Sequence, residues 1–339
     1  MKAVVCTHPR NLVVQEIERP EPGEGQILVQ VKATGICGSD VHGYLGELDW
    51  ISYPIIFGHE FSGVVAAVGP GVTNAQPGDE VVVDNLIPCG TCALCLAGKH
   101  HLCLNLRIIG FHTAGSYAEY CIAPIADFVY PKPANLSFAE AALTDPLSGA
   151  LHATRRANLQ VSEFVVIFGA GTLGLMAMQV AKAQATEVLI SDVSDAKLEL
   201  ARSLGADHVV NARRQDVLRV VRDLTSGVGA DAAFEAVGSA QTIKDAVAAI
   251  RKGGRAVFIG LSPTPYNEVN MNDVTMGEKT LLGTFGFRRE YPDAMKLLSA
   301  GIVKAAPLIS YRFPLVELTQ AMETILSKRD EVYKVVIEC

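Results

Sequence analysis

Residues Phe164-Val165-Val166-Ile167-Phe168-Gly169-Ala170-Gly171-Thr172-Leu173-Gly174 decide the fold of this chain. The first five are a continuous apolar run, which is typical of a central strand buried on both faces of a parallel sheet. Three glycines follow in the pattern GxGxxG, and the apolar residues after them predict a helix to about Ala185. This stretch therefore predicts a buried strand, a tight turn and a helix.

A second strand, Glu187 to Ser191, follows the predicted helix and ends at Asp192, 18 residues after Gly174. Strand, glycine loop, helix, strand and terminal acid in this order indicate a dinucleotide-binding unit. Gly169 permits the turn, Gly171 lets the backbone approach a pyrophosphate, and Gly174 lets the helix pack on the strand. The helix N-terminus would receive the phosphates. Asp192 can bind the ribose hydroxyls and would repel a 2′-phosphate, so NAD is favoured over NADP.

The alternation of helices and strands continues along the chain and predicts a doubly wound parallel sheet of six strands. The later predicted elements are helix Asp195 to Leu204, strand His208 to Val210, helix Asp216 to Leu224, strand Ala230 to Glu235, helix Ala240 to Ile250, strand Arg255 to Gly260 and strand Thr280 to Phe285. Two further helices (291–300 and 315–327) and a strand, Lys334 to Ile337, are expected to return to the first domain, which is then discontinuous.

The N-terminal half has the pattern of a mostly β domain, a small barrel or a sandwich. Its predicted strands are Met1 to Cys6, Leu12 to Ile17, Gln26 to Lys32, Ser62 to Val68 and Glu80 to Val83. Turns rich in proline and glycine separate them.

Two short motifs in this half carry possible metal ligands: Cys37-Gly38-Ser39-Asp40-Val41-His42 and Gly58-His59-Glu60. Cysteine, histidine and glutamate bind zinc, and a catalytic zinc takes three protein ligands and keeps one position open. Taken singly, Cys37 could be a buried apolar thiol and His59 a hydrogen-bonded core histidine. Their occurrence together with a dinucleotide fingerprint favours the metal.

Four of the eight cysteines crowd together at Cys89, Cys92, Cys95 and Cys103, with two, two and seven residues between them. Four thiolates at such spacing can close a tetrahedral shell around zinc, which leaves no position for water. We therefore expect a structural zinc; free or disulfide-linked thiols are the alternative. The lobe carries few basic residues and no aromatic platform, so a nucleic-acid-binding zinc ribbon is not favoured.

A third carboxylate, Asp145, follows a helix that should begin at Ser137 with a capping box to Glu140. Asp145 precedes Pro146, so it could also be a solvated loop residue.

Composition excludes several classes of function. The chain has 339 residues, 49% of them apolar and 19% charged, which is ample for a core and argues against disorder. The net charge of −7 disfavours nucleic acid or an anionic membrane as a partner. Residues 164–181 lack charge, but they contain the glycine loop, so we interpret them as buried structure. No signal peptide is visible, and we expect a soluble cytoplasmic protein.

With these motifs, the chain resembles the zinc-containing medium-chain dehydrogenase/reductase family of the alcohol dehydrogenase superfamily over essentially its whole length. The segment Asp145-Pro146-Leu147-Ser148 is similar to the branch of polyol, threonine and sugar-acid dehydrogenases. The resemblance implies a discontinuous GroES-like catalytic domain (1–147 and 287–339) and a Rossmann NAD-binding domain (148–286). It also implies a homodimer or homotetramer.

The resemblance implies roles for particular residues. Cys37 and His59 would bind the catalytic zinc directly. Glu60 would be a direct or alternating ligand. Asp145 would ligate the zinc or hold its water, although the Asp145 side chain is one methylene shorter than the glutamate that many relatives have there. Asp40 would orient His59. The cofactor would contact the glycine loop (Gly169, Gly171, Thr172, Leu173, Gly174), Asp192 and Lys197 at the adenine ribose, and Ala236, Val237, Ile259, Gly260, Phe285 and Gly286 near the nicotinamide.

The expected reaction is hydride transfer between NAD and a secondary alcohol of a polyol, sugar acid or related sugar derivative. Ser39 would accept the alcohol proton and His42 would relay it to solvent; a cap hydroxyl and a surface histidine are the alternatives. Tyr44 and His112 could contact substrate hydroxyls or simply pack. Arg288 and Arg289 could clamp a carboxylate or phosphate, or form a solvated face.

Other functions remain open from the sequence. A threonine or simple alcohol dehydrogenase has the same motifs. A zinc-independent quinone or enone reductase would share the fold without needing Cys37, His59 or the four cysteines. A regulator that binds NAD without turnover is a third alternative.

Overall fold

The computed structural model describes residues 1–262, 268–287 and 289–339, and its chain divides into two compact units. The first unit contains Met1–Asp145, Tyr291–Ala300 and Leu308–Cys339, and the second contains Pro146–Glu290 and Gly301–Pro307. The domain boundaries expected from the sequence lay after residues 147 and 286. None of the described helices is long and apolar enough to cross a membrane.

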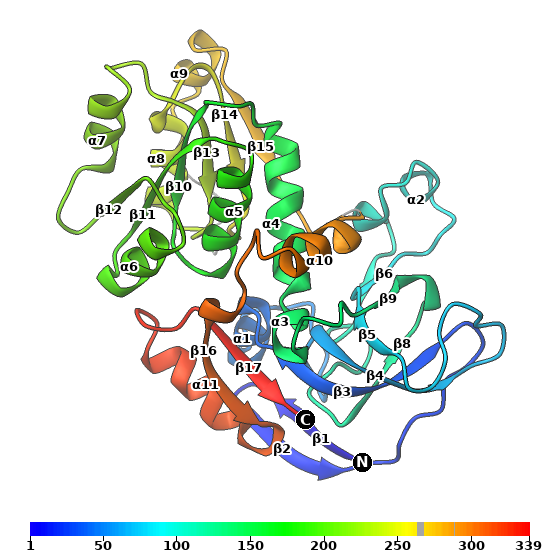
Figure 1. The fold of residues 1–339 in the computed structure, drawn as a ribbon. Helices are drawn as coiled ribbons and strands as arrows, with labels where there is room; N and C mark the ends of the chain where they lie inside the picture. Colours follow the sequence, from blue (N-terminus) through cyan, green and yellow to red (C-terminus); the bar gives the residue numbers. More distant parts are fainter. Residues whose placement is uncertain (263–267, 288) are drawn as a thin grey trace. The chain divides into compact units, whose positions relative to one another are not determined.

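The second unit is built on a six-stranded sheet in which every neighbouring pair is parallel (Figure 1). The predicted doubly wound sheet is therefore confirmed. Its spatial order is β12 (His208–Asn211), β11 (Glu187–Asp192), β10 (Phe164–Phe168), β13 (Ala230–Glu235), β14 (Ile250–Phe258) and β15 (Thr280–Gly283). The order reverses at β10, and such a switch point is where open α/β sheets bind their ligands.

Helices precede and connect these strands along the chain, the first of them beginning in the first unit, and they cover both faces of the sheet (Figure 1). They are α4 (Thr144–Ala157), α5 (Thr172–Ala183), α6 (Asp195–Ser203), α7 (Val217–Leu224), α8 (Ala240–Ala249) and α9 (Met271–Met276). One hydrophobic core joins side chains of α7 and α8 to Val166 and Phe168 of β10. All five residues of β10 are buried, as its apolar run predicts.

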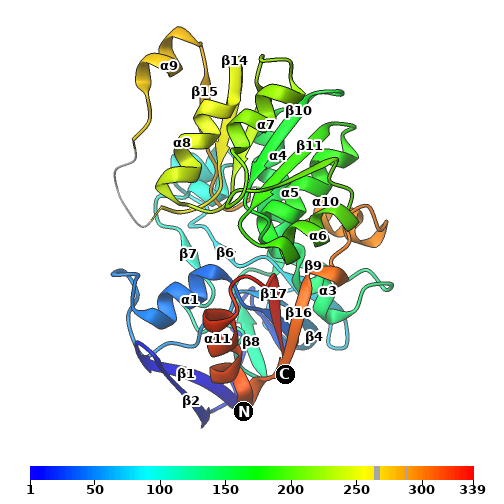
Figure 2. The same cartoon turned by 90° about the vertical axis from the view of Figure 1, so that its left-hand side faces the viewer.

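The first unit contains a seven-stranded sheet in which most neighbours are antiparallel (Figure 2). Its strands are β3 (Ile27–Gly35), β4 (Glu60–Val68), β5 (Glu80–Val83), β8 (Tyr120–Ala123), β9 (Val129–Pro131), β16 (Ile309–Pro314) and β17 (Lys334–Glu338). The pairs β1 (Lys2–His8) with β2 (Asn11–Glu16) and β6 (Leu86–Ile87) with β7 (Arg107–Ile108) form small sheets.

The helices of the first unit are short. They are α1 (Gly38–Leu45), α2 (Ala93–Leu96), α3 (Phe138–Ala142), α10 (Tyr291–Ser299) and α11 (Leu318–Ser327), with 3-10 turns η1 (His100–Leu102), η2 (Ala126–Phe128), η3 (Ala306–Leu308, partly in the second unit) and η4 (Leu315–Glu317). As predicted, Ser137 caps α3 and exchanges hydrogen bonds with Glu140. The return of residues after 290 places β17 beside β3.

Several elements differ from the sequence-based expectation. Strand β14 begins at Ile250 instead of Arg255, because its first residue pairs with Ala230 across a register shift. Strand β15 ends at Gly283, before Phe285. Helix α9 was not expected.

Asp145 is not the solvated loop residue that its position before a proline allowed. It lies in the first turn of α4 and only 7% of its surface is exposed. A proline is tolerated in that turn because the N–H groups there have no partner within the helix.

Candidate functional site

Cys37 lies at the N-cap of α1, directly after β3. Its backbone N–H donates to Asp40 Oδ2 at 2.9 Å, so the third helical residue closes the first turn. The other oxygen of Asp40 accepts from Gly58 N–H at 3.3 Å. These bonds join the two predicted metal motifs through one buried carboxylate.

His59 precedes β4 and is buried. Its Nδ1 lies 3.3 Å from Asp40 Oδ1, which leaves Nε2 as the ring nitrogen available to a metal. Burial lowers the pKa of His59, but the charges and hydrogen bonds of Asp40 and Cys37 together outweigh this effect and hold the pKa well above its ordinary value. Asp40 also accepts a hydrogen bond from Tyr117 at 2.9 Å, so the orienting carboxylate is itself held in place.

Cys37, His59 and Glu60 each offer one ligand atom, and the three atoms lie within 4.8 Å of one another. A thiolate, an imidazole and a carboxylate are ligands that zinc accepts, and three protein ligands leave one position for another molecule. The donor set therefore fits a catalytic zinc.

Glu60 has a partner that the sequence did not indicate. Lys334 of β17 places Nζ 2.9 Å from Glu60 Oε1 and 2.7 Å from Oε2, and it also donates to Ile36 O at 3.0 Å. Both side chains are buried. A Cβ atom at Gly35 would lie 2.2 Å from Glu60 Oε2, so a glycine is required at that point of β3.

Asp145 does not belong to the set of three in the part of the chain that the structure describes. Its Oδ2 accepts hydrogen bonds from Asn85 Nδ2 at 2.6 Å and from Tyr291 Oη at 2.8 Å. Burial raises the pKa of Asp145 to about 7. These two donors fix the carboxylate, and the charges of His59 and Glu60 act on it as well.

Ser39 and His42 both lie on α1, three residues apart, and such residues share a face of a helix. His42 Nδ1 lies 2.5 Å from Glu47 Oε2, and both side chains are more than half exposed. The His42 side chain is therefore in contact with solvent.

The remaining substrate candidates differ in environment. Tyr44 is buried and its hydroxyl lies 3.4 Å from Arg10 O, which favours a packing role. His112 is exposed, and its Nδ1 accepts a hydrogen bond from Ile108 N–H at 3.2 Å. The backbone of Arg289 donates to Glu290 at 2.8 Å, and Arg288 lies outside the described residues.

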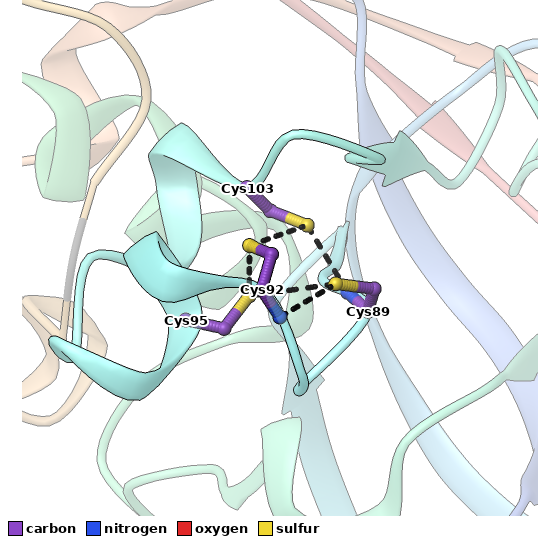
Figure 3. Close-up of side chains that lie close together, drawn as sticks. All are labelled: Cys89, Cys92, Cys95 and Cys103. Carbon is purple, nitrogen blue, oxygen red and sulfur yellow. Dashed lines mark hydrogen bonds between the residues drawn. The ribbon is translucent and has the colours of Figure 1, made fainter.

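The four cysteines of the predicted structural site converge around a common centre (Figure 3). The Sγ atoms of Cys92 and Cys95 lie 3.5 Å apart, and those of Cys89 and Cys95 lie 4.0 Å apart. Four sulfurs this close without a bond between them fit a tetrahedral zinc.

Backbone N–H groups point at these sulfurs. The N–H of Cys92 lies 3.4 Å from Cys89 Sγ. The backbone of Thr91 and that of Cys92 lower the pKa of Cys89 to about 6, so its thiolate forms readily. Burial raises the pKa of Cys95 to about 12. A bound cation would favour the thiolate at all four positions.

The glycine loop of the second unit lies between β10 and α5. Gly169 has φ 102°, a conformation that favours glycine. A Cβ at Gly174 would lie 1.9 Å from Gly169 O, whereas a Cβ at Gly171 would meet nothing within 4 Å. Gly174 is thus needed for packing, and the space above Gly171 fits a closely approaching pyrophosphate.

Asp192 ends β11 beside this loop. Its Oδ2 accepts from Ala170 N–H at 2.7 Å and its Oδ1 from Ser194 N–H at 2.9 Å. Lys197 lies in the first turn of α6, where Ser194 caps its backbone N–H at 3.3 Å. Each carboxylate oxygen retains capacity for a further hydrogen bond, such as one from a ribose hydroxyl.

The other predicted cofactor residues follow the carboxyl ends of neighbouring strands. Ala236 and Val237 follow β13, Ile259 and Gly260 follow β14, and Phe285 and Gly286 follow β15. Val237 and Phe285 are 50% and 47% exposed, so both apolar side chains are accessible to a ligand ring. The buried Glu235 fixes the backbone after β13, because its Oε1 accepts hydrogen bonds from the N–H groups of Val237 and Gly238 at 2.9 and 2.8 Å.

Four residues near the metal motifs were missed by the sequence analysis: Trp50, Asn85, Tyr291 and Lys334. Asn85, Tyr291 and Lys334 come from separate segments and carry no local spacing signal. Trp50 could have been noticed as the single tryptophan of the chain, in the loop after the first metal motif.

The sequence matches two family models. Residues 23–134 match the alcohol dehydrogenase GroES-like domain, and residues 172–300 match the zinc-binding dehydrogenase domain.

Three relatives illustrate the similarity. Sorbitol dehydrogenase of Bacillus subtilis is 34% identical over 99% of this chain and 97% of its own. L-threonine 3-dehydrogenase of Bacillus velezensis is 35% identical over 99% and 98%. The crystal structure of galactitol-1-phosphate dehydrogenase from Escherichia coli superposes with a TM-score of 0.92 at 29% identity, covering 100% of both chains. The chain therefore belongs to the zinc-type medium-chain alcohol dehydrogenases.

Proposed function

We propose that this oxidoreductase transfers a hydride between NAD and a secondary alcohol of a polyol or a related sugar derivative. The convergence of Cys37, His59 and Glu60 in the first unit is the observation that carries the proposal. The presence of sorbitol, threonine and galactitol-phosphate dehydrogenases among its relatives supports this substrate class.

Cys37, His59 and Glu60 would hold the catalytic zinc. Zinc supplies Lewis acidity, which strongly lowers the pKa of a hydroxyl group that it binds. Asp40 orients the His59 imidazole through Nδ1 at 3.3 Å. Asp145, fixed by Asn85 and Tyr291, would accept a hydrogen bond from the substrate or from a water beside it.

Ser39 would take the proton of the substrate hydroxyl, and His42 would pass it to solvent. This path is supported by the common face that the two residues share on α1 and by the exposure of His42. Glu47, at 2.5 Å from His42 Nδ1, would hold the imidazole in its orientation.

The second unit would bind NAD with its pyrophosphate over Gly171 and its adenosine ribose at Asp192. The carboxylate of Asp192 would repel the 2′-phosphate of NADP, which supports NAD as the cofactor. Val237 and Phe285 would contact the nicotinamide side. A second, structural zinc would be held by Cys89, Cys92, Cys95 and Cys103.

The test combines activity with metal analysis. Zinc-loaded protein is assayed for NADH formation with sorbitol, xylitol, galactitol, L-threonine and 2,3-butanediol, and zinc is measured by mass spectrometry. We expect polyol-dependent NADH formation and about two zinc ions per chain. Cys37→Ser should abolish turnover and reduce the zinc content to about one.

Cys6→Ser is the matched control. Cys6 is a buried cysteine whose thiol donates to His8 O at 3.3 Å, and its replacement should preserve turnover and zinc. A wild-type protein that contains no zinc, or that reduces NAD with none of these compounds, would contradict the proposed function. Full zinc content in Cys37→Ser would contradict the assignment of the metal residues.

A further inference from the structure

Trp50 is an exposed aromatic ring next to the metal residues of the first unit. It lies in the loop that follows α1, and 54% of its surface is exposed. Its neighbour Ile51 is buried, so the loop is anchored directly beside the indole. An indole held at a fixed position in solvent offers a large and rigid apolar surface to a ligand.

The indole contacts two other rings and is still half exposed. It stacks on the imidazole of His112, with ring centroids 5.6 Å apart and an angle of 17° between the planes. The edge of Phe111 meets it at 5.4 Å and 61°. These contacts hold the ring in place, and its exposed surface stays available to a ligand.

Phe111 connects this ring pair to the metal residues. Its ring centroid lies 5.2 Å from that of His59, so the same phenyl ring touches both the indole and a zinc-binding candidate. The ring of Phe57 packs against that of Phe111, with centroids 6.0 Å apart. Phe111 therefore contacts both Trp50 and His59 and connects the exposed indole to the metal residues.

His112 adds a hydrogen-bond donor to this surface. Because its Nδ1 accepts from Ile108 N–H at 3.2 Å, the neutral ring carries its proton on Nε2. Burial and the charge of Arg107 lower the pKa of His112, so the ring is neutral near pH 7. Arg107 also donates to His112 O at 3.0 Å and fixes this residue.

We propose that Trp50 and His112 form a platform that binds the part of the substrate chain farthest from the reacting alcohol. The platform deepens the proposed function, on which it rests. The C–H groups along one side of a polyol are weakly positive and are attracted to the negative face of an indole. Hydroxyl groups of the same chain can accept from His112 Nε2. Such a surface selects polyols longer than a simple secondary alcohol.

The first test uses intrinsic fluorescence, because Trp50 is the single tryptophan of the chain. Zinc-loaded protein without nicotinamide is titrated with sorbitol, xylitol and 2-propanol. We expect the emission to change in a saturable way with the polyols and to stay constant with 2-propanol, which is too short to reach the indole. Constant emission with every polyol would overturn the platform.

The second test uses steady-state kinetics of Trp50→Leu and Trp50→Phe. Trp50→Leu should raise KM for the preferred polyol about tenfold with little change in kcat, because an aromatic contact is lost. KM for 2-propanol should not change, and Trp50→Phe should recover most of the loss. Tyr311→Leu is the matched control, since it removes a ring stacked on Phe313 in β16.

An equal rise in KM for polyol and 2-propanol would overturn the inference, because a platform for the distal chain cannot affect a three-carbon alcohol. Failure of the wild-type protein to oxidise any alcohol would instead contradict the proposed function. The fluorescence titration needs no turnover, so it tests binding at Trp50 whether or not the protein oxidises an alcohol.

Discussion

Lys334 Nζ lies 2.7 Å from Glu60 Oε2, and both side chains are buried in the first unit. The lysine comes from the last strand and the glutamate from β4, so the ion pair fastens the C-terminal strand to the metal residues. It also balances the charge of a glutamate that must remain beside a thiol and an imidazole.

Replacement of Lys334 by Met should reveal this role. The variant leaves the Glu60 carboxylate buried without its cation, which typically costs about 3–5 kcal/mol in the free energy of unfolding. The double variant Lys334→Met, Glu60→Gln should recover part of the loss. Urea unfolding of the chelator-treated proteins measures both effects, because a bound zinc would itself act on Glu60.

Lys296→Met provides the control, because Lys296 pairs with Asp293 on the surface at 3.1 Å. An exposed pair contributes less than about 1 kcal/mol. Equal losses in Lys334→Met and Lys296→Met would show that the buried pair does not stabilise the first unit.

The parts of this protein that could be predicted from sequence depend on short-range patterns. The apolar run Phe164–Phe168 and the glycines after it define strand and turn by themselves, because burial and backbone geometry act within a few residues. The spacing of Cys89, Cys92, Cys95 and Cys103 has the same local character, and the four sulfurs do converge.

The parts that could not be predicted depend on contacts between distant segments. Nothing near Lys334 indicates that β17 will place it against Glu60, and nothing near Tyr291 indicates a bond to Asp145. Pro146 left the setting of Asp145 open, because a proline ends a helix in its interior but is tolerated in a first turn. Trp50 acquires its meaning only from the rings of Phe111 and His112.

Two glycines of the cofactor loop should respond differently to alanine. In Gly174→Ala the new methyl group would collide with Gly169 O, so we expect a loss of about 1–3 kcal/mol in the free energy of unfolding. In Gly171→Ala the methyl group has open space and an ordinary φ of −77°, so stability should change by less than about 1 kcal/mol.

NADH binding separates the two variants further. Gly171→Ala should weaken NADH binding by about tenfold or more, because the methyl group lies where the pyrophosphate approaches the backbone. Calorimetric titration with NADH measures this effect on a protein of normal stability. Unchanged NADH affinity in Gly171→Ala would mean that the dinucleotide does not lie over this loop.

Asp192→Asn should change the cofactor preference. Loss of the charge removes the repulsion of a 2′-phosphate and weakens the hydrogen bonds to the ribose, bonds that are worth about 1.5–3 kcal/mol when one partner is charged. We expect the ratio of kcat/KM for NAD to that for NADP to fall at least about tenfold. Asp207→Asn is the control, since Asp207 also accepts a strand N–H, from Val188 at 2.7 Å. A similar fall of this ratio in Asp192→Asn and Asp207→Asn would mean that Asp192 does not determine the cofactor preference.

Asp145→Asn should leave the zinc content unchanged. Oδ2 of Asp145 is already engaged by Asn85 and Tyr291, and Asp145 lies outside the set of three ligand atoms. Turnover should fall, because an amide accepts hydrogen bonds more weakly than a carboxylate. Zinc analysis and kcat are measured on the same preparation. Loss of one zinc per chain would identify Asp145 as a direct ligand and displace Glu60 from that role.

The four-cysteine lobe should keep its shape when its zinc is removed, and thiol reactivity can show this. The pKa of Cys89 is about 6 and that of Cys95 is about 12, because backbone N–H groups face the first thiol and burial surrounds the second. As the pH rises through 6, Cys89 loses its proton, and the thiolate is the reactive form. In chelator-treated protein at pH 7, iodoacetamide should therefore modify Cys89 first and Cys95 last. Peptide mass spectrometry resolves each cysteine, and zinc-loaded protein should be protected at all four. Equal rates at Cys89 and Cys95 would mean that the lobe unfolds without its metal, since only the folded backbone distinguishes the two thiols.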